Sequence, residues 1–323
     1  MPVLVTGAAG FIGMHVSEAL MARGETVVGI DNLNDYYDVS LKEARLERLR
    51  KHNAFSFVRG DICDRDALDE AGRDADRIVH LAAQAGVRYS LENPGAYIQA
   101  NIVGHLNVLE LARAKGDDLV HLAYASSSSV YGGNTKLPFS VDDQVDNPVS
   151  LYAATKKSDE LMSHAYAATY GLPSTGLRFF TVYGPWGRPD MSLYIFTRKI
   201  LAGEPIPVFN NGEMQRDFTY IDDIVAGVLA ALDNPPPRDG DAAPHRVYNL
   251  GNHRSEPLMR FIGLIEDALD TRAEIDFQPM QPGDVPATYA DIEASRRDLG
   301  FEPTTPIDEG IPKFVAWYRE YHG

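Results

Sequence analysis

Residues 3–20 read VLVTGAAGFIGMHVSEAL, in which a short apolar run is followed by glycines at Gly7, Gly10 and Gly13. The pattern predicts a buried strand, a tight turn and a helix that begins at Phe11 and Ile12. Glycine lets the backbone approach a ligand closely, and the free N–H groups at a helix start attract a pyrophosphate. The stretch therefore predicts a dinucleotide site; the alternative is an ordinary strand–turn–helix corner.

A second apolar run, residues 26–30, ends at Asp31. An acidic residue at this strand end can accept hydrogen bonds from both ribose hydroxyls of NAD, and it would repel the 2'-phosphate of NADP. Asp31 therefore favours the dinucleotide interpretation over a plain corner, and it favours NAD as the cofactor.

Strand and helix patterns continue to alternate beyond this point. Further strands are predicted at 55–58, 77–81 and 119–124, with helices at 41–52 and 67–72 and a long helix through Asn101. Parallel strands joined by helices must be covered on both faces, which explains why the strand runs are apolar throughout. The predicted fold class is therefore α/β, a doubly wound parallel sheet.

Polar and small residues follow the predicted strands, at the edge where open parallel sheets bind ligands. Asp61 lies where a side chain could reach an adenine, and the small residues 82–86 would let a cofactor lie against the backbone. Tight helix packing is the alternative for that small-residue run. The cofactor-binding residues expected from these patterns are Gly7, Gly10, Phe11, Ile12, Gly13, Asp31, Asn32, Asn34, Asp61, Ile62, Leu81, Ala82, Ala83 and Gln84.

Composition narrows the class of protein. The net charge of −16 argues against binding to nucleic acid or to an anionic membrane surface, since both require a positive field. The only cysteine is Cys63, and no Cys/His cluster has zinc spacing, so we expect no disulfide framework and no metal. No export signal or membrane span is visible, and we expect a cytoplasmic protein.

A possible catalytic set follows the strand at 119–124. Four serines, Ser126 to Ser129, come at its end, and a helix predicted to begin near Ser150 carries Tyr152 and Lys156. Tyrosine and lysine four residues apart share one helix face, so the ammonium group can favour the phenolate that general base catalysis needs. The spacing alone is weak, because a Tyr-x-x-x-Lys pair on a solvated helix also occurs by chance.

With these motifs together, the sequence resembles the extended short-chain dehydrogenase/reductases over essentially its whole length, and among them the nucleotide-sugar epimerases. The resemblance implies a Rossmann fold and makes Ser127 catalytic with Tyr152 and Lys156, although Ser128 is a rival for Ser127. It also implies that Asn101 and Phe179 line the nicotinamide side and that Lys156 contacts a ribose.

The resemblance also limits the reaction. Sugar dehydratases of this kind carry Asp and Glu directly after the catalytic threonine, and the decarboxylases carry a Glu at the position of Ser129. Here Ser128 and Ser129 occupy these positions. Without such an acid the chain can oxidise and reduce a sugar but lacks the group for elimination, which leaves epimerisation.

The substrate end begins after the predicted strand 176–180. Residues 181–191, Thr-Val-Tyr-Gly-Pro-Trp-Gly-Arg-Pro-Asp-Met, closely resemble the corresponding segment of UDP-glucuronate 4-epimerases. In that family the threonine and arginine hold the sugar carboxylate, which implies this role for Thr181 and Arg188. Arginine suits it because it binds a carboxylate through two parallel hydrogen bonds. A surface ion pair is the alternative for Arg188.

Later segments resemble the part of the family that binds the nucleotide. This implies that Arg216 contacts the phosphates, Phe209 the uracil and Asp284 the uridine ribose, while Gln281 replaces an arginine usual in related enzymes. Arg88 faces either the sugar or solvent. Asp222 and Asp223 look like a capped start of a helix at 224–232 rather than an acid/base pair, and residues 235–244 look like an exposed loop.

The sequence thus predicts an NAD-binding domain at 1–180, with a returning segment near 217–250, and a UDP-sugar lobe mainly at 181–323. The predicted reaction is C4 epimerisation of UDP-glucuronate to UDP-galacturonate by a homodimer. A 4-epimerase of neutral UDP-hexoses or UDP-N-acetylhexosamines is the nearer alternative. A non-catalytic NAD-sensing protein is the remote one.

Overall fold

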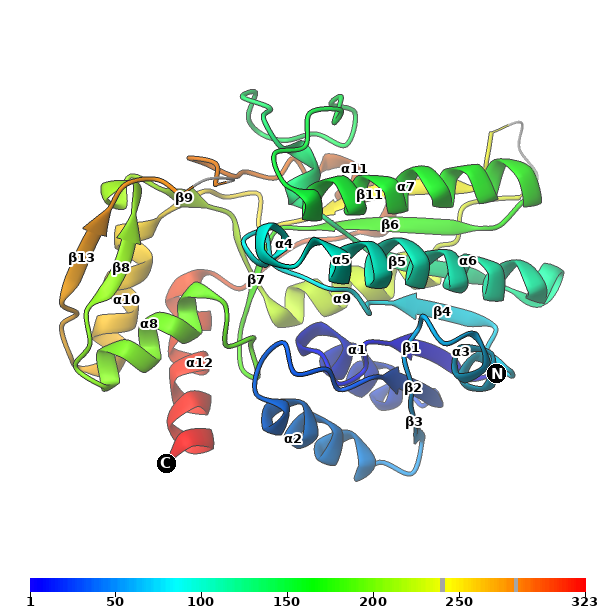
Figure 1. Ribbon diagram of the computed structural model, residues 1–323, viewed down its shortest axis with the longest axis horizontal. Helices are drawn as coiled ribbons and strands as arrows, with labels where there is room; N and C mark the ends of the chain where they lie inside the picture. Colours follow the sequence, from blue (N-terminus) through cyan, green and yellow to red (C-terminus); the bar gives the residue numbers. More distant parts are fainter. Residues whose placement is uncertain (239–241, 282–283) are drawn as a thin grey trace.

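The structure is a computed structural model that describes residues 1–238, 242–281 and 284–323. Its centre is a seven-stranded sheet in the order β11-β6-β5-β4-β1-β2-β3, in which every pair is parallel (Figure 1). The predicted α/β parallel sheet is therefore confirmed. Its strands are β1 (Val3–Thr6), β2 (Val27–Asp31), β3 (Phe55–Arg59), β4 (Arg77–His80), β5 (His121–Ser127), β6 (Ser174–Phe179) and β11 (His245–Leu250).

Helices cover both faces of the sheet. In β1, Val3 and Val5 pack in one apolar cluster and Leu4 in another, because successive side chains of a strand point to opposite faces. Helices α1 (Phe11–Ala22), α2 (Val39–Arg50) and α9 (Ile221–Asp233) pack on one side, and α3 (Arg65–Gly72), α6 (Gly104–Lys115) and α7 (Leu151–Tyr170) on the other. The shorter helical elements are α4 (Tyr89–Glu92), α5 (Pro94–Tyr97), η1 (Ile98–Val103), η2 (Gly116–Asp118), η3 (Ser128–Tyr131) and α11 (Glu293–Leu299).

Three local expectations differ from the structure. The helix through Asn101 is interrupted, since residues 98–103 form the π-helix η1 before α6 begins. The strand expected at 119–124 runs instead from His121 to Ser127, so Ser127 is its last residue. Asp223 does not cap α9; its carboxylate accepts hydrogen bonds from the backbone N–H groups of Thr304 and Thr305 and so fastens a distant loop.

Beyond β6 the chain builds a smaller group of elements at one end of the sheet, on the left in Figure 1. Three short strand pairs, β7 with β10, β8 with β13 and β9 with β12, lie among three longer helices. The elements are β7 (Thr181–Tyr183), α8 (Ser192–Leu201), β8 (Ile206–Phe209), η4 (Asn210–Gly212), β9 (Gln215–Arg216), β10 (Phe218–Tyr220), β12 (Glu256–Pro257), α10 (Leu258–Leu269), β13 (Ile275–Gln278) and α12 (Ile307–His322). The division at residue 180 stays a prediction.

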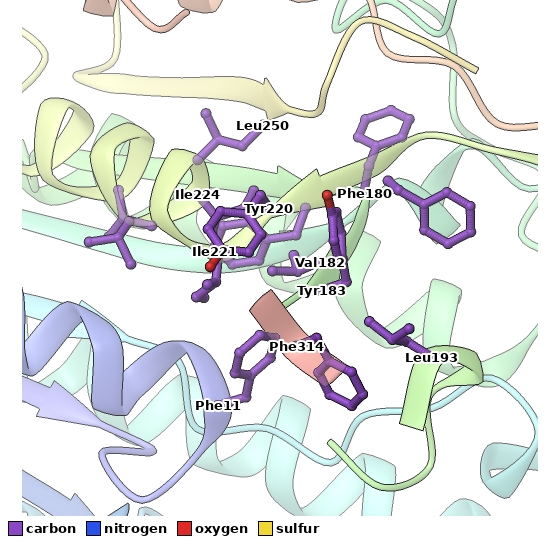
Figure 2. Packing of buried hydrophobic residues seen from close by; sticks show 14 of the residues in the cluster. Phe11, Phe180, Val182, Tyr183, Leu193, Tyr220, Ile221, Ile224, Leu250 and Phe314 are labelled. Carbon is purple, nitrogen blue, oxygen red and sulfur yellow. The ribbon is translucent and has the colours of Figure 1, made fainter. Parts of the chain in front are cut away.

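One apolar cluster continues from the sheet into this second group. Figure 2 shows Phe11 of α1 and Phe314 of α12 in the same packing region as Val182 and Tyr183 of β7. Burial of shared apolar surface holds the two parts of the chain against each other. In the part of the chain that the structure describes, no helix is long and apolar enough to cross a membrane. Residues 239–241 of the expected loop at 235–244 lie outside that part.

Candidate active site

One cavity of about 880 Å³ brings most of the predicted site residues together. It lies at the carboxyl ends of the sheet strands and extends to the segments after β6. The predicted residues that line it are Gly7, Gly10, Phe11, Ile12, Gly13, Asp31, Asn32, Asn34, Asp61, Ile62, Leu81, Ala82, Ala83, Gln84, Arg88, Ser127, Ser128, Tyr152, Lys156, Phe179, Thr181, Arg188, Phe209, Arg216 and Asp284.

The glycine turn forms a close-fitting cradle at one end of the cavity. Gly7 has a φ of +71°, and a Cβ atom on it would lie 2.8 Å from the backbone nitrogen of Ala82. A Cβ atom on Gly13 would lie 2.1 Å from the carbonyl oxygen of Gly7. Helix α1 begins after Gly10 with no side-chain cap, so its first N–H groups are available to an anion. These features fit a dinucleotide pyrophosphate.

Asp31 stands at the end of β2, beside this turn. Its carboxylate accepts hydrogen bonds from Ala9 N at 3.1 Å and from Leu33 N at 2.9 Å, so the acid also holds the turn in place. Burial raises the pKa of Asp31, which the two backbone hydrogen bonds and Lys42 oppose. Farther along the same edge, Asn32 donates to Asp61 at 2.8 Å.

Asn101 lies behind the cavity wall and is not among the described residues that line it. Its side-chain oxygen accepts a hydrogen bond from Gln84 N at 2.8 Å, and its amide donates to Gln84 O at 3.1 Å and to Thr155 at 3.0 Å. Both ends of the amide are therefore engaged within the protein. In the structure Asn101 positions Gln84, which lines the cavity, and its expected place on the nicotinamide side stays a prediction.

The serine, tyrosine and lysine come from two adjacent elements. Ser127 ends β5, and its hydroxyl accepts a hydrogen bond from Ser129 N at 3.1 Å. Tyr152 lies in the first turn of α7, which the Ser150 hydroxyl caps by accepting from Ala153 N at 3.1 Å. All three predicted catalytic side chains reach the same cavity.

The Lys156 ammonium group is held by residues other than Tyr152. Its Nζ atom donates to the carbonyl oxygen of Ala125 and to Oδ2 of Asp159, both at 3.0 Å. Lys156 and Asp159 are both buried, and the sequence patterns had predicted no role for the aspartate. The pairing of Asp159 with Lys156 could have been predicted from the sequence, because the aspartate follows the lysine by three residues and so lies on the same helix face.

A buried ion pair supports the catalytic elements from behind. Arg178 of β6 donates to both carboxylate oxygens of Glu160 on α7, at 2.8 and 2.9 Å. Ser126 of β5 donates to the same carboxylate at 2.7 Å. Because one carboxylate joins three elements, the end of β5 and the face of α7 are held in one arrangement.

The predicted carboxylate-binding arginine already carries a partner inside the cavity. Arg188 donates from Nε to Oδ1 of Asp190 at 3.0 Å, and its Nη2 also contacts that carboxylate. Tyr36, from the loop between β2 and α2, donates to Asp190 at 3.1 Å. The alternative expected for Arg188 was a surface ion pair. Arg188 does form an ion pair, but the pair lies in the cavity, because Arg188, Asp190 and Tyr36 all line it.

The residues expected at the nucleotide gather at the other end of the cavity. The Arg88 guanidinium carbon lies 4.5 Å from the centre of the Phe209 ring, and Arg88 pairs with Asp284 at 3.2 Å. Arg216 donates to the carbonyl oxygens of Gln215 and Pro286, and burial lowers its pKa. The structure thus places Arg88 beside the predicted nucleotide residues. Residues 282 and 283 of that predicted loop lie outside the described residues.

A parallel sheet with a glycine cradle, an acidic strand end and a Ser–Tyr–Lys set in one cavity defines a short-chain dehydrogenase/reductase. Residues 3–251 match the model of the NAD dependent epimerase/dehydratase family. The chain belongs to this family and is an NAD-dependent enzyme.

Relatives and solved structures narrow the comparison. The chain is 50% identical over 332 residues to UDP-glucuronate 4-epimerase 4 of Arabidopsis thaliana, covering 99% of this chain and 76% of that protein. It is 48% identical over 334 residues to a probable UDP-glucuronate 4-epimerase of Rhizobium meliloti, covering 99% and 97%. The crystal structure of a Bacillus cereus UDP-glucuronic acid 4-epimerase with UDP-glucuronic acid and NAD matches with a TM-score of 0.92 and 33% identity, covering 100% of both chains.

Proposed function

We propose that the enzyme interconverts UDP-glucuronate and UDP-galacturonate by epimerisation at C4. The observation that carries the proposal is the single cavity in which the glycine cradle, Ser127, Tyr152 and Arg188 meet. A cofactor, a proton acceptor and a carboxylate-binding cation are the three groups that this reaction needs in one place. The names of the relatives support the same substrate.

The cofactor would lie along the carboxyl edge of the sheet, with its pyrophosphate at the glycine cradle and a ribose at Asp31. The chemistry that NAD supplies when bound is reversible hydride transfer at C4 of the sugar, which gives a 4-keto sugar and then either C4 epimer. Because NAD transfers only hydride, side chains of the protein must accept and return the hydroxyl proton.

Tyr152 is the proposed base. Its phenol oxygen takes the proton of the C4 hydroxyl and later returns it, while Ser127 or Ser128 hydrogen-bonds the same oxygen. Lys156, on the same face of α7, supplies positive charge that stabilises the phenolate. A crystal structure of a tyrosine-to-phenylalanine variant of the Bacillus cereus enzyme with a 4-deoxy-4-fluoro substrate analogue and NAD is consistent with a tyrosine near this centre.

Arg188 and Thr181 are the proposed ligands of the sugar carboxylate. A 4-keto uronate is a β-keto acid that loses carbon dioxide readily, so the carboxylate must be held while the sugar turns about its pyrophosphate bonds. Arg216, Phe209, Asp284 and Arg88 would hold the nucleotide during this turn, because they gather at the other end of the cavity.

Product analysis tests the substrate. Purified enzyme is incubated separately with UDP-glucuronate and UDP-glucose, and the products are separated by chromatography. We expect UDP-galacturonate as the main product from the first and far slower turnover of the second. Faster turnover of UDP-glucose would favour the neutral-hexose alternative, and a UDP-pentose as the main product would contradict epimerisation.

Replacing Tyr152 with Phe tests the base. The variant keeps the ring and loses only the hydroxyl, so we expect turnover to fall by at least a factor of about 1,000 while NAD stays bound. The matched control is Tyr170→Phe, at the exposed end of the same helix. Full activity in Tyr152→Phe would remove Tyr152 from the base role.

We further infer a cytoplasmic homodimer. Ile98 of η1, Leu106 of α6 and Leu161 of α7 are exposed apolar residues on helices that pack side by side. A second copy of the same helices would cover this face, because a twofold axis brings identical surfaces together. Sedimentation should give about twice the chain mass, and Leu161→Lys should give the monomer. A wild-type monomer at micromolar concentration would contradict the inference.

A further inference from the structure

Asp190 and Tyr36, for which the sequence predicted no role, form a cluster with Arg188 in the wall of the cavity. The Arg188 and Asp190 side chains are 24% and 25% exposed, so solvent reaches both but surrounds neither. Tyr36 donates its hydroxyl hydrogen to Asp190 at 3.1 Å. The cluster therefore joins the loop between β2 and α2 to the segment after β7.

The guanidinium group can serve two carboxylates at once. It carries five N–H hydrogens in one plane, arranged along two edges that each match a carboxylate. Asp190 occupies the edge formed by Nε and Nη2. Tyr36 also lies within reach of the Arg188 guanidinium group. Among the described residues, Asp190 is the one carboxylate paired with Arg188, so the edge formed by Nη1 and Nη2 can donate to a second carboxylate.

The charges of the cluster remain in place at neutral pH. Burial opposes ionisation of Asp190, but the nearby Arg188 outweighs it and lowers the pKa of the carboxyl group. Burial and the Asp190 charge raise the pKa of Tyr36 to about 12, so its hydroxyl stays a donor. Tyr36 is itself held by packing against Tyr89, with ring centres 4.9 Å apart.

We propose that Asp190 and Tyr36 are positioning residues that select a sugar bearing a carboxylate, an inference that rests on the proposed function. Together they hold Arg188 on one edge, so that its other edge is already oriented when the substrate arrives. A carboxylate accepts two parallel hydrogen bonds from that edge. A neutral hydroxymethyl group has one oxygen and gains little from the same arrangement.

The test is calorimetric binding of UDP-glucuronate and of UDP-glucose to the NAD-loaded enzyme and its variants. Asp190→Asn keeps the shape of the side chain but removes the charge. The variant loses the charge-assisted hydrogen bonds that orient Arg188, and it also loses a negative charge close to the substrate carboxylate. We expect the lost orientation to outweigh the relieved repulsion, so that UDP-glucuronate binding weakens about tenfold, the size of one charge-assisted hydrogen bond, and UDP-glucose binding changes less than about twofold. Tyr36→Phe should weaken UDP-glucuronate binding by a smaller factor in the same direction.

Glu302→Gln is the matched control, because this carboxylate pairs with Arg296 on the surface, and it should leave both affinities unchanged. Unchanged or tighter UDP-glucuronate binding in both Asp190→Asn and Tyr36→Phe would overturn the proposal, as would an equal loss for both sugars. Binding of UDP-glucuronate by the wild type without any C4 product would overturn only the proposed function. No binding by the wild type would overturn both.

Discussion

Lys156 and Asp159 form a buried ion pair one helical turn from Tyr152. Their side chains are 4% and 1% exposed, and Nζ lies 3.0 Å from Oδ2. His105 and His80 lie in the same buried region behind them, and burial lowers the pKa of both imidazoles, so neither adds a positive charge at neutral pH. The carboxylate therefore balances the charge of Lys156, which is the charge expected to assist Tyr152.

Asp159→Asn should change the pH dependence of catalysis. Burial raises the pKa of Asp159 to about 6, with Lys156 opposing, so the carboxylate is charged at neutral pH. Removing its negative charge leaves the Lys156 ammonium unbalanced, which favours the Tyr152 phenolate. We expect the acid limb of kcat against pH to move down by about half a unit to one unit. The exposed Asp69→Asn serves as control, and a shift to higher pH would contradict this role.

Among the individual elements, helix α1 packs its first turn directly against the glycine turn that precedes it. Gly13 lies in the first turn of α1, where the carbonyl oxygen of Gly7 occupies the space of a side chain. Gly263 lies inside α10 with no heavy atom within 4 Å of the place of its Cβ. An alanine side chain would therefore clash with the backbone at position 13, whereas it would meet open space at position 263.

Gly13→Ala and Gly263→Ala form a matched pair. The first change forces the turn and helix apart, so we expect a loss of about 1–3 kcal/mol in the free energy of unfolding and weaker NAD retention. The second removes backbone freedom from the unfolded chain, so we expect a gain of about 0.5–1 kcal/mol with NAD retention unchanged. Urea unfolding and measurement of bound NAD check both, and equal effects at the two sites would contradict the argument.

Glu160 connects α7 to β5 and β6 through a buried ion pair. Glu160→Gln leaves the Arg178 guanidinium buried without its counter-ion, and we expect a loss of about 3–5 kcal/mol in the free energy of unfolding. Asp69→Asn breaks the exposed Arg65–Asp69 pair and should cost less than about 1 kcal/mol. Thermal or urea unfolding compares the two variants, and a small loss for Glu160→Gln would show that the pair does not hold these elements.

At the scale of the whole molecule, Asp217 joins segments that are far apart in the chain. Its buried carboxylate accepts hydrogen bonds from Asn252 N at 2.6 Å and from Ala290 N at 3.0 Å. Thr219 donates to it as well, at 3.2 Å. Asp217 thus fastens the start of β10 to the segment around Asn252, which follows β11, and to the segment around Ala290, which precedes α11.

The pH dependence of stability tests this junction. Burial raises the pKa of Asp217 to about 6 in the folded protein, above its model-peptide value of 3.8. The folded state therefore binds the proton more tightly, and the stability it contributes is present at low pH and lost as the pH rises through about 6. From about pH 5.5 to pH 7.5, the wild type should lose about 1 kcal/mol relative to Asp217→Asn. A constant difference between the two would contradict this origin.

Local patterns in the sequence predicted most strands of the parallel sheet and the glycine turn, while the family resemblance supplied most of the candidate substrate residues. Parallel strands that are buried on both faces require unbroken apolar runs, so each strand can be predicted from its own short stretch of sequence. The Tyr152–Lys156 pair could also be predicted from a short stretch, because residues four apart lie on one face of a helix. The helices α10 and α12 were not predicted. Pro312 interrupts the pattern of α12, whereas the apolar spacing of α10 at Leu258, Phe261 and Ile265 is that of an amphipathic helix and could have revealed it.

The pairing of those residues depends on contacts between segments that are far apart in the chain. Tyr36 and Asp190 are 154 positions apart, and they meet because the sheet brings the loop after β2 beside the segment after β7. The partner of Arg188, the burial of Asp159 and the place of Asn101 behind the cavity wall depend on the same long-range packing. The spacing of apolar residues predicts local secondary structure, whereas a hydrogen bond between distant segments depends on how the helices and strands pack in the complete fold.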